Sequence, residues 1–376
     1  MKIVLAPDKF KGSLTGLEFC NAVQEGVLEV LPSAKIIKLP LADGGDGTIE
    51  ILEHHLKGKR ISVKVNDPLF RPITASYLYM ETIETAFIEM AEASGMALLK
   101  PEDRNCLYTT TYGTGELILD AVNRGAKTII MGIGGSATND CGIGMAKALG
   151  YKFEDENGIE LSPIGKNLSH IKSINVTNVI SNLKSITFKV ACDVTNPLFG
   201  SNGAAFVYGP QKGASKNEIT LLDNGLQHIS ELFSAIFNYD VQNIEGSGAA
   251  GGMGAGALVF LNAELQSGIH LIKDLIDFDK KIKGADWIIT GEGKLDVQTL
   301  SGKTINGVIE SAKKQNIEVA AFCGSISLQK QSLYEYGISY SASVIDEAIS
   351  LADAMKNVHL YLTNISIEFS NKIDVE

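Results

Sequence analysis

The chain has 376 residues, of which 45% are hydrophobic and 20% charged, a balance typical of a globular enzyme rather than a disordered chain. This length exceeds what one ordinary hydrophobic core supports, so we expect two or three domains. The formal net charge of −11 argues against non-specific binding to nucleic acid or to an anionic membrane, which leaves small molecules as the expected partners.

Cysteine usage and apolar runs bear on the location of the protein. The five cysteines are far apart and form no C-x-x-C motif, which indicates thiols in a reducing compartment. The chain opens directly on an expected strand, which leaves no room for a signal peptide, and no apolar run reaches the ~20 residues that a membrane helix needs. We therefore expect a cytoplasmic protein without a membrane partner, and the oligomeric state stays open.

The first elements alternate between strand and helix. Residues 2–6 are predicted to form a buried strand, followed by a loop at 8–13 and a helix that ends near Val30. Loops beyond the carboxyl ends of parallel strands are where such sheets bind ligands. The loop with Lys9 and Lys11 is thus a candidate phosphate site; solvated surface lysines are the alternative.

A second strand, 35–39, leads into a glycine-rich loop and a helix that ends near Leu56. The loop carries Asp43 and Asp46 among three glycines, which puts carboxylates on closely approachable backbone. Such oxygen ligands suit Mg²⁺. A turn capped by its own aspartates is the alternative.

The pattern changes at Arg60. Three short segments, 61–65, 73–79 and 85–90, read as antiparallel strands between turn signals, which predicts a domain boundary here. A helix over 110–125 follows.

The glycine-rich stretch at 132–140 lies between an expected buried strand, 128–131, and an expected helix, 141–149. A strand that runs through glycines into a helix leaves backbone N–H groups free to bind an anion, most often a phosphate. Asp140 at the helix entry would repel a bare phosphate, which indicates a bridging Mg²⁺ or a substrate hydroxyl. The alternative is a tight turn in which Asn139 or Asp140 caps the helix.

A third candidate follows the strand expected at 185–191. Asp193 at the end of this strand, with Asn196 shortly after it, suits a catalytic carboxylate and an amide that orients it. An Asx turn before Pro197 is the alternative.

Two further segments resemble nucleotide-binding motifs but lack a feature that each motif requires. The glycine run 246–256 contains a formal G-x-G-x-x-G, yet no convincing strand precedes it. Residues 301–304 end like a P-loop, but Val297 stands where that motif requires glycine. Lys303 still lies at the start of an expected helix, where it could reach an anion. After it, strand and helix alternate as at the N-terminus, which predicts that the middle of the chain is inserted into the first domain.

Several of these segments together resemble the type 1 glycerate kinase family, in the family's order and over essentially the whole chain. The matching segments are 42–48, 132–140, 191–197, 209–214, 248–254 and 290–293. The sequence departs from the family at Lys9, where serine is frequent, and at Cys141, where glycine is usual.

The resemblance implies ATP-dependent phosphorylation of D-glycerate to 2-phosphoglycerate with Mg²⁺. It implies an α/β fold of two α/β domains, with the active site in the cleft between them. One would be a Rossmann-like parallel-sheet domain built from both chain ends (1–66 and 285–376), and the other an inserted domain with a mixed sheet (67–284).

For this activity we assign hypothetical roles to the candidate residues. The catalytic residues would be Asp193, which accepts or orients the proton of the glycerate hydroxyl, Lys11 and Lys303. The metal ligands would be Asp43 and Asp296. The residues for phosphate or nucleotide would be Asp8, Ser13, Gly134, Gly135, Ser136 and Glu292. The residues for the second substrate would be Arg71, Asn139, Asn196 and Lys212.

A second hypothesis is an NAD(P)-dependent oxidoreductase acting on a small hydroxy acid. It depends on the glycine-rich segments at 132–134 and 246–251. Lysine-bearing glycine loops and scattered aspartates suit phosphoryl transfer better. A sensor that binds a small organic acid without catalysis is a third possibility.

Overall fold

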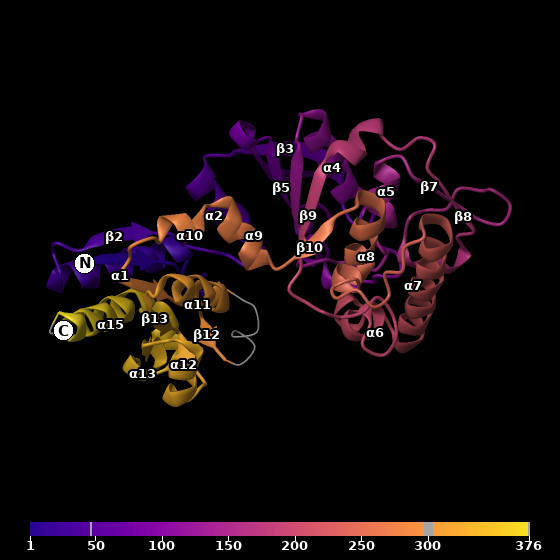
Figure 1. Cartoon of the computed structure of the whole chain (residues 1–376). Coiled ribbons are helices and arrows are strands. Elements are labelled where there is room, and N and C mark those ends of the chain that lie inside the picture. The colour runs from indigo at the N-terminus through magenta and orange to yellow at the C-terminus, as the bar shows by residue number, and fades with distance from the viewer. Residues whose placement is uncertain (46, 297–303, 375–376) are drawn as a thin grey trace. The chain divides into compact units, whose positions relative to one another are not determined.

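A computed structural model describes residues 1–45, 47–296 and 304–374 of the chain (Figure 1). They form two compact units. Unit 1 comprises Met1–Asp43 and Ile269–Glu376, and unit 2 comprises Gly44–Gly268. Unit 1 is therefore built from both chain ends, with the middle of the chain inserted.

The main sheet of unit 1 is parallel. Over the described residues its strand order is β15-β13-β11-β1-β2, and every neighbouring pair is parallel. The strands are β1 (Lys2–Leu5), β2 (Lys35–Lys38), β11 (Trp287–Thr290), β13 (Glu318–Cys323) and β15 (Tyr340–Ser343). Their carboxyl ends lie at one edge, so the loops that follow them gather there.

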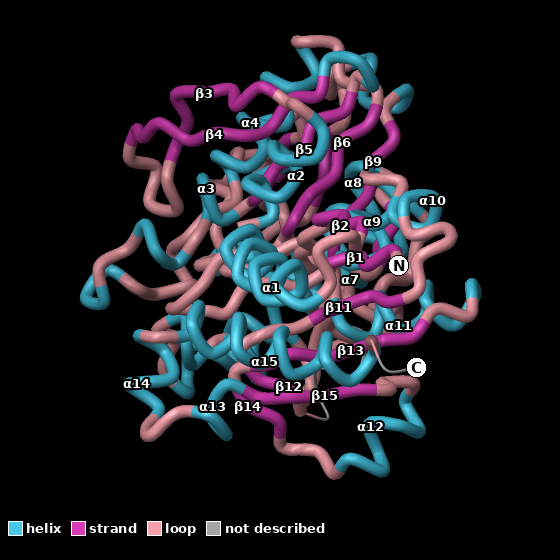
Figure 2. The backbone as a smooth tube through the Cα atoms, turned by 90° about the vertical axis from the view of Figure 1, so that its left-hand side faces the viewer, coloured by secondary structure: helices cyan, strands magenta, loops and turns pink. Residues whose placement is uncertain are grey.

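Helices α1 (Gly16–Val30) and α15 (Val358–Ile373) pack side by side in this unit (Figure 2). They share a buried cluster with the sheet, in which Phe19 and Phe369 are 0% exposed. Thr15 and Glu18 form the capping box that their spacing favours, because each backbone N–H is bonded to the other side chain.

Over the described residues, the remaining elements of unit 1 are one helix of 12 residues, α11, and several shorter helices and strands. The helices are α9 (Gly268–Leu275), α10 (Phe278–Lys281), α11 (Thr304–Gln315), α12 (Lys330–Tyr336), α13 (Val344–Glu347) and α14 (Leu351–Lys356). Strands β12 (Lys294–Leu295) and β14 (Ser325–Ile326) form a small parallel pair. The chain ends in two helices, α14 and α15, which are separated at Asn357.

The main sheet of unit 2 is mixed, with the order β10-β9-β6-β5-β4-β3 over the described residues. Strands β10, β9, β6 and β5 are parallel, and β5, β4 and β3 are antiparallel. Their bounds are β3 (Lys59–Asn66), β4 (Pro72–Met80), β5 (Thr85–Glu89), β6 (Thr128–Gly132), β9 (Thr187–Ala191) and β10 (Glu264–Gln266). A separate hairpin pairs β7 (Lys152–Glu154) with β8 (Ser173–Asn175).

The α-helices of unit 2 include two contacting groups, α4 with α5 and α6 with α7 and α8 (Figure 1). Their bounds are α2 (Thr48–Leu56), α3 (Ala91–Ser94), α4 (Tyr112–Asn123), α5 (Ile143–Ala148), α6 (Ala204–Tyr208), α7 (Lys216–Phe237) and α8 (Ala249–Leu261). Helix α5 begins two residues after the expected start, because Cys141 and Gly142 have φ of 53° and 71°.

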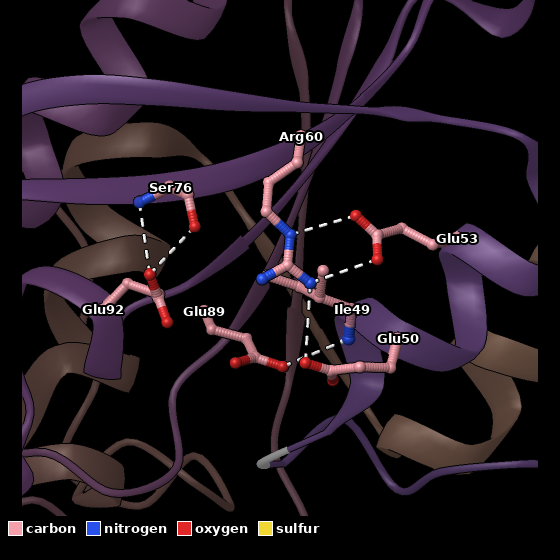
Figure 3. Close-up of polar contacts among 7 residues, drawn as sticks. All are labelled: Ile49, Glu50, Glu53, Arg60, Ser76, Glu89 and Glu92. Atoms are coloured by element: carbon pink, nitrogen blue, oxygen red, sulfur yellow. Dashed lines mark hydrogen bonds and ion pairs between the residues drawn. The ribbon is translucent and has the colours of Figure 1, made fainter.

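Helix α2 is held to the mixed sheet by an exposed ion-pair group (Figure 3). Arg60 of β3 donates to Glu53 over 3.0 Å and 3.1 Å and to Glu50 over 3.5 Å. Strand β3 pairs along its whole length with β4. These contacts group residues 44–66 with unit 2, whereas the bounds expected from the resemblance place residues 1–66 in the domain built from the chain ends. Residues 269–284 lie in unit 1 rather than in the middle domain.

Two general features complete the fold. All five cysteines are free thiols, and only Cys192 among them is not buried. In the part of the chain that the structure describes, no helix combines the length and the apolar character that crossing a membrane requires.

Candidate active site

Unit 1 contains a cavity of about 400 Å³ at the carboxyl edge of its parallel sheet. We call it the unit-1 pocket. Five of the predicted site residues line it, and they come from three separate loops: Asp8, Lys11, Ser13, Asp43 and Glu292. The structure therefore brings together residues that the sequence assigned to phosphate, metal and catalysis.

Main-chain hydrogen bonds fix the loops of this pocket. The N–H of Asp8 donates to the carbonyl oxygen of Gly291 over 2.8 Å, and the N–H of Leu41 donates to that of Pro7 over 2.8 Å. A Cβ on Gly324 would lie 2.4 Å from the carbonyl oxygen of Gly293, so only glycine allows this close approach. The loops of the pocket are thus held by backbone contacts rather than by adaptable side chains.

Asp8 is a carboxylate of the pocket with a raised pKa. It accepts hydrogen bonds from the N–H of Lys9 over 2.7 Å and from the hydroxyl of Thr304 over 2.6 Å. Burial, and then the nearby negative charge of Asp43, raise the pKa of Asp8 to about 6. Two adjacent carboxylates that repel each other favour a bound cation between them.

The other two candidates from this unit differ in position. Asp296 does not line the unit-1 pocket, and its carboxylate lies 3.2 Å from the Nζ of Lys294, which does. Lys303 lies outside the described residues.

Unit 2 presents the glycine-rich loop 133–142 after β6. A Cβ on Gly132 would lie 2.3 Å from the carbonyl oxygen of Gly44, so the strand end packs directly on another backbone segment. Gly134 and Gly135 are exposed, whereas Ser136 and the residues that follow it are buried. The loop thus runs from the surface into the core.

A buried lysine from a different segment meets this loop. Lys212, at the end of a 3₁₀ helix (Pro210–Lys212), is 4% exposed. Its Nζ donates to the hydroxyl of Ser136 over 2.8 Å and to the carbonyl oxygen of Thr138 over 2.7 Å. Burial lowers the pKa of Lys212 to about 8.

Asn139 lies beside these groups in the sequence and is 0% exposed. Both polar atoms of its amide, and the hydroxyl of Thr138, are buried without a hydrogen-bond partner among the described residues. Buried polar groups are normally paired, so these atoms require a ligand or water. We call Ser136, Thr138, Asn139 and Lys212 the Lys212 cluster.

Asp140 caps the start of α5. Its buried carboxylate accepts from the N–H and the hydroxyl of Thr111, both over 2.8 Å, and from the N–H groups of Gly142 and Gly144, both over 3.2 Å. Asp140 therefore holds the first turn of α5, although the N-cap residue itself is Gly142, and a bridging role toward Mg²⁺ is not needed to explain this residue.

Asp193 follows β9 and is exposed. Its Oδ1 accepts from the N–H of Gly268 over 3.1 Å, which orients the carboxylate. The amide of Asn196 has other partners, because it donates to the carbonyl oxygen of Asn202 over 2.9 Å and accepts from the hydroxyl of Tyr208 over 2.6 Å. Asp193 is thus oriented by backbone rather than by the amide that the sequence favoured.

Arg71 is held by two carboxylates. Its Nε donates to Asp67 over 2.6 Å, and a terminal nitrogen lies 3.2 Å from Asp103. The side chain is exposed, so the guanidinium lies at the surface in a local ion-pair group.

Sequence reasoning missed several residues around both sites. In unit 1 these are Lys294 and an apolar group from the C-terminal region, for which no local pattern gives a signal. In unit 2 it missed Thr138, although this residue lies inside the glycine-rich stretch, and Arg104, whose Nε is buried without a partner among the described residues.

The glycine run 246–256 has a packing role. Gly251 and Gly252 have φ of 71° and 85° inside α8. A Cβ on Gly251 would lie 2.1 Å from the carbonyl oxygen of Thr138, so this run packs backbone to backbone against the 133–142 loop. Residues 238–248, all described, contain no strand, which removes the context that a dinucleotide motif requires.

Comparisons with known proteins agree with one another. The model of the glycerate kinase family matches residues 3–373. The glycerate kinase of Bacillus subtilis (strain 168) is 42% identical over 373 residues, covering 99% of this chain and 98% of that protein. The glycerate 2-kinase of Escherichia coli (strain K12) is 43% identical over 359 residues, covering 96% and 94%.

The crystal structure of a candidate glycerate kinase 2 from Salmonella typhimurium LT2 is similar with a TM-score of 0.88 and 40% identity, covering 100% of this chain and 99% of that one. Its similarity supports the two α/β domains. The oxidoreductase hypothesis finds no support in the glycine run or in these relatives.

Proposed function

This chain belongs to the glycerate kinase family, and we propose that it transfers the γ-phosphoryl group of ATP to the 2-hydroxyl of D-glycerate, with Mg²⁺, giving ADP and 2-phosphoglycerate. Family membership makes the chain a phosphotransferase that acts on small molecules. The position of the phosphorylated hydroxyl rests on the name of the Escherichia coli relative. Five free thiols suit a reducing compartment, so the proposal includes a cytoplasmic location.

The unit-1 pocket supplies the groups that a metal–nucleotide complex requires. Asp8 and Asp43 would hold Mg²⁺, an ion that usually takes one or two carboxylates together with substrate phosphates and waters. Among the described residues, no three or more His, Cys, Asp or Glu side chains are grouped so that they could hold a metal ion. When bound, Mg²⁺ neutralises phosphate charge.

The lysines of the pocket complement the phosphates. Lys9 and Lys11 stand on the loop after β1, and Ser13 follows with a hydroxyl 3.3 Å from the carbonyl oxygen of Phe10. Phosphoryl transfer asks the protein mainly for positioning and charge neutralisation. Glu292 lines the same pocket. Asp296 remains proposed as a further metal ligand and Lys303 as a further catalytic residue.

The Lys212 cluster supplies groups for the glycerate carboxylate. A buried cation beside an amide and a hydroxyl that lack partners suits a small, planar anion. The hydroxyl of Ser136, which accepts from Lys212, keeps its own proton to donate. Gly134 and Gly135 form the exposed approach to this cluster.

Asp193 is the proposed general base. Its carboxylate is exposed and oriented by the N–H of Gly268, so it could accept the proton of the 2-hydroxyl as the new P–O bond forms. Arg71 and Asn196 remain proposed for substrate binding, although their present partners make them the weaker candidates.

The convergence of lysines and carboxylates in one cavity of unit 1 is the observation that carries this proposal. The test is a coupled ADP-release assay with D-glycerate, L-glycerate or no acceptor, with and without Mg²⁺, followed by identification of the product by ³¹P NMR. ADP release that requires D-glycerate and yields the 2-phosphate supports the proposal. ADP release independent of glycerate would refute it.

A further inference from the structure

The unit-1 pocket has a second side that the chemistry above does not use. This side is apolar, unlike the charged loops, and comes from the C-terminal part of the chain. Its residues are Val344, Leu351, Ala354, Met355 and Val358. A cavity of about 400 Å³ lies within the range of small-molecule sites, which are mostly apolar with a few placed polar groups.

Three helices form this apolar side. Val344 opens α13, Leu351 and Met355 belong to α14, and Val358 opens α15; the helices pack against one another (Figure 2). Val344, Ala354 and Val358 are at most 5% exposed, whereas Leu351 is 67% exposed and Met355 44%. The surface thus has a buried floor and two large apolar side chains open to solvent.

The apolar side meets the charged side at Gly12. Gly12 has φ of 81°, and a Cβ placed on it would lie 3.7 Å from the Cε of Met355. Met355 therefore packs beside the loop that carries Lys11 and Ser13. A ligand that covers Met355 with an apolar group would place a charged extension next to that loop.

We infer that this apolar side is the binding surface for the nucleobase of the phosphoryl donor. The inference rests on the proposed function, which puts the phosphates at Lys9, Lys11 and Ser13. A nucleoside triphosphate has a flat, weakly polar base joined through a ribose to a polyanion, and this matches one cavity with an apolar side and a cationic side.

The chemistry of the side chains favours a base held by its faces. Thioether sulfur makes favourable contacts with aromatic rings, and Met355 is the flexible member of the surface. None of the five apolar side chains carries a hydrogen-bonding group, so none of them reads the edge of the base. We therefore expect ATP and GTP to differ in kcat/KM by less than about tenfold, since the side chains that contact the base offer no polar discrimination.

The experiment uses the full chain with Leu351→Ala and Met355→Ala. Each truncation removes exposed apolar surface and leaves the buried floor intact. Losing a few tens of Å² of contact should raise KM for ATP about fivefold in each variant. We expect KM for D-glycerate and kcat to stay within about twofold of the wild type, because the charged loops and unit 2 are untouched.

Leu360→Ala is the matched control. Leu360 lies on α15, is 57% exposed and does not line the unit-1 pocket. Its truncation should leave KM for ATP unchanged. An equal effect in this control, or no effect in both test variants, would overturn the inference.

Two inhibitors separate the base from the phosphates. Adenosine should inhibit competitively with ATP and should lose about fivefold in affinity in the Leu351→Ala and Met355→Ala variants. Inorganic tripolyphosphate should inhibit all variants equally, because it lacks a base. If the variants weaken inhibition by tripolyphosphate as much as inhibition by adenosine, the apolar side chains affect the phosphate-binding loop rather than contact a base. The inference would then be wrong.

Direct calorimetry of ADP keeps this inference separate from the proposed function. The wild type could release no ADP with D-glycerate and still bind ADP more tightly than the two variants do. That result would refute the proposed reaction with glycerate and support the inferred binding surface for the base. If ADP binds the wild type and both variants with equal affinity, the inferred binding surface for the base is refuted, whether or not the protein phosphorylates glycerate. A shift of the wild type, but not Leu351→Ala, to a dimer in sedimentation would show that a second copy covers this surface, and would also overturn the inference.

Discussion

The unit-1 pocket and the Lys212 cluster both depend on lysine, but they hold it in opposite ways. Lys11 is exposed beside an open cavity, where a cation costs little to maintain. Lys212 is 4% exposed and bonded to a hydroxyl and a carbonyl oxygen, so its charge is kept at a desolvation cost. An open cation can follow a flexible polyanion, whereas a buried, fixed one suits a small anion of defined shape. The first matches the phosphates of a nucleotide, and the second matches a carboxylate.

The largest expected effect tests whether unit 2 supplies the reacting base. Asp193→Asn keeps an acceptor for the N–H of Gly268 but removes the proton acceptor. We expect kcat to fall by about 10²-fold or more, because general bases contribute on that scale. The measurement is steady-state ADP release at saturating substrates.

Asp240→Asn is the control for this change. Asp240 is also an exposed residue of unit 2 whose carboxylate accepts from a backbone N–H, that of Gln242, over 3.1 Å. It should leave kcat unchanged. Near-normal turnover in Asp193→Asn would remove the residue from the reaction.

The next effect compares two buried lysines. Lys212→Met should raise KM for D-glycerate by about 50-fold, the scale of a lost charge-assisted hydrogen bond, while KM for ATP stays constant. Lys273 of unit 1 is also buried, and its Nζ donates to the carbonyl oxygen of Gly307 over 2.7 Å. Lys273→Met should lower the melting temperature without changing either KM. Equal effects of both variants on KM for glycerate would mean that Lys212 is only a structural residue.

Part of the two sites follows from simple rules of sequence. Asp8 and Lys11 follow the strand expected at 2–6, and Asp43 follows the one expected at 35–39. The carboxyl ends of parallel strands lie at one edge, so the joint position of these residues in one cavity could be predicted. The mixed sheet of unit 2 depends on long-range pairing and was expected only from the resemblance to a family. Its strand order was not predicted.

Other parts could not be predicted from local patterns. The bond between Lys212 and Ser136 spans 76 residues, so the sequence selected each residue separately without indicating the contact. Asn196 and Arg71 are of residue types that can bind a substrate. Asparagine is also common in turns, and arginine is also common in surface ion pairs. Leu351 and Met355 were not among the predicted site residues, because nothing local in the sequence marks the break at Asn357 that separates α14 from α15.

A stability measurement tests the carboxylate pair of the unit-1 pocket without any substrate. The pKa of Asp8 is about 6 in the folded protein and near its ordinary value of 3.8 when unfolded. The folded state therefore binds the extra proton between these values, and the free energy of unfolding falls as pH rises from about 4 to about 6 and is level above.

Asp8→Asn should abolish this dependence. Relative to the wild type, the variant should gain on the order of 2 kcal/mol between pH 4 and pH 7 in urea unfolding without Mg²⁺ or nucleotide. Asp43→Asn should move the wild-type transition to lower pH, because it removes the second cause of the shift. Parallel pH profiles of the wild type and Asp8→Asn would contradict the coupling.

Lys212 of unit 2 predicts that the affinity for D-glycerate depends on pH. The pKa of Lys212 is lowered to about 8, so the ammonium form is lost as pH rises through that value. Affinity for a carboxylate should fall with it, and kcat/KM for D-glycerate should drop by up to about tenfold between pH 7 and pH 9. Lys212→Arg should keep its charge and flatten this profile, even if its fit is poorer. The same drop in Lys212→Arg would assign the profile to another group.

The smallest expected effect belongs to the exposed lysine and completes the comparison. Lys11→Gln should raise KM for ATP only about fivefold, because an exposed ion pair is screened by solvent and neighbouring Lys9 keeps part of the local charge. The ratio of wild-type to variant KM should shrink toward one as salt is raised, whereas the Lys212→Met effect on glycerate should persist, since buried charges are screened less. Lys35→Gln, an exposed change on β2 away from the pocket lining, is the matched control and should leave KM for ATP unchanged. The effect of Lys11→Gln on KM for ATP could instead be as large as that of Lys212→Met on KM for glycerate and independent of salt. The loop after β1 would then hold its phosphate in a desolvated site, and the contrast between an exposed and a buried cation would be wrong.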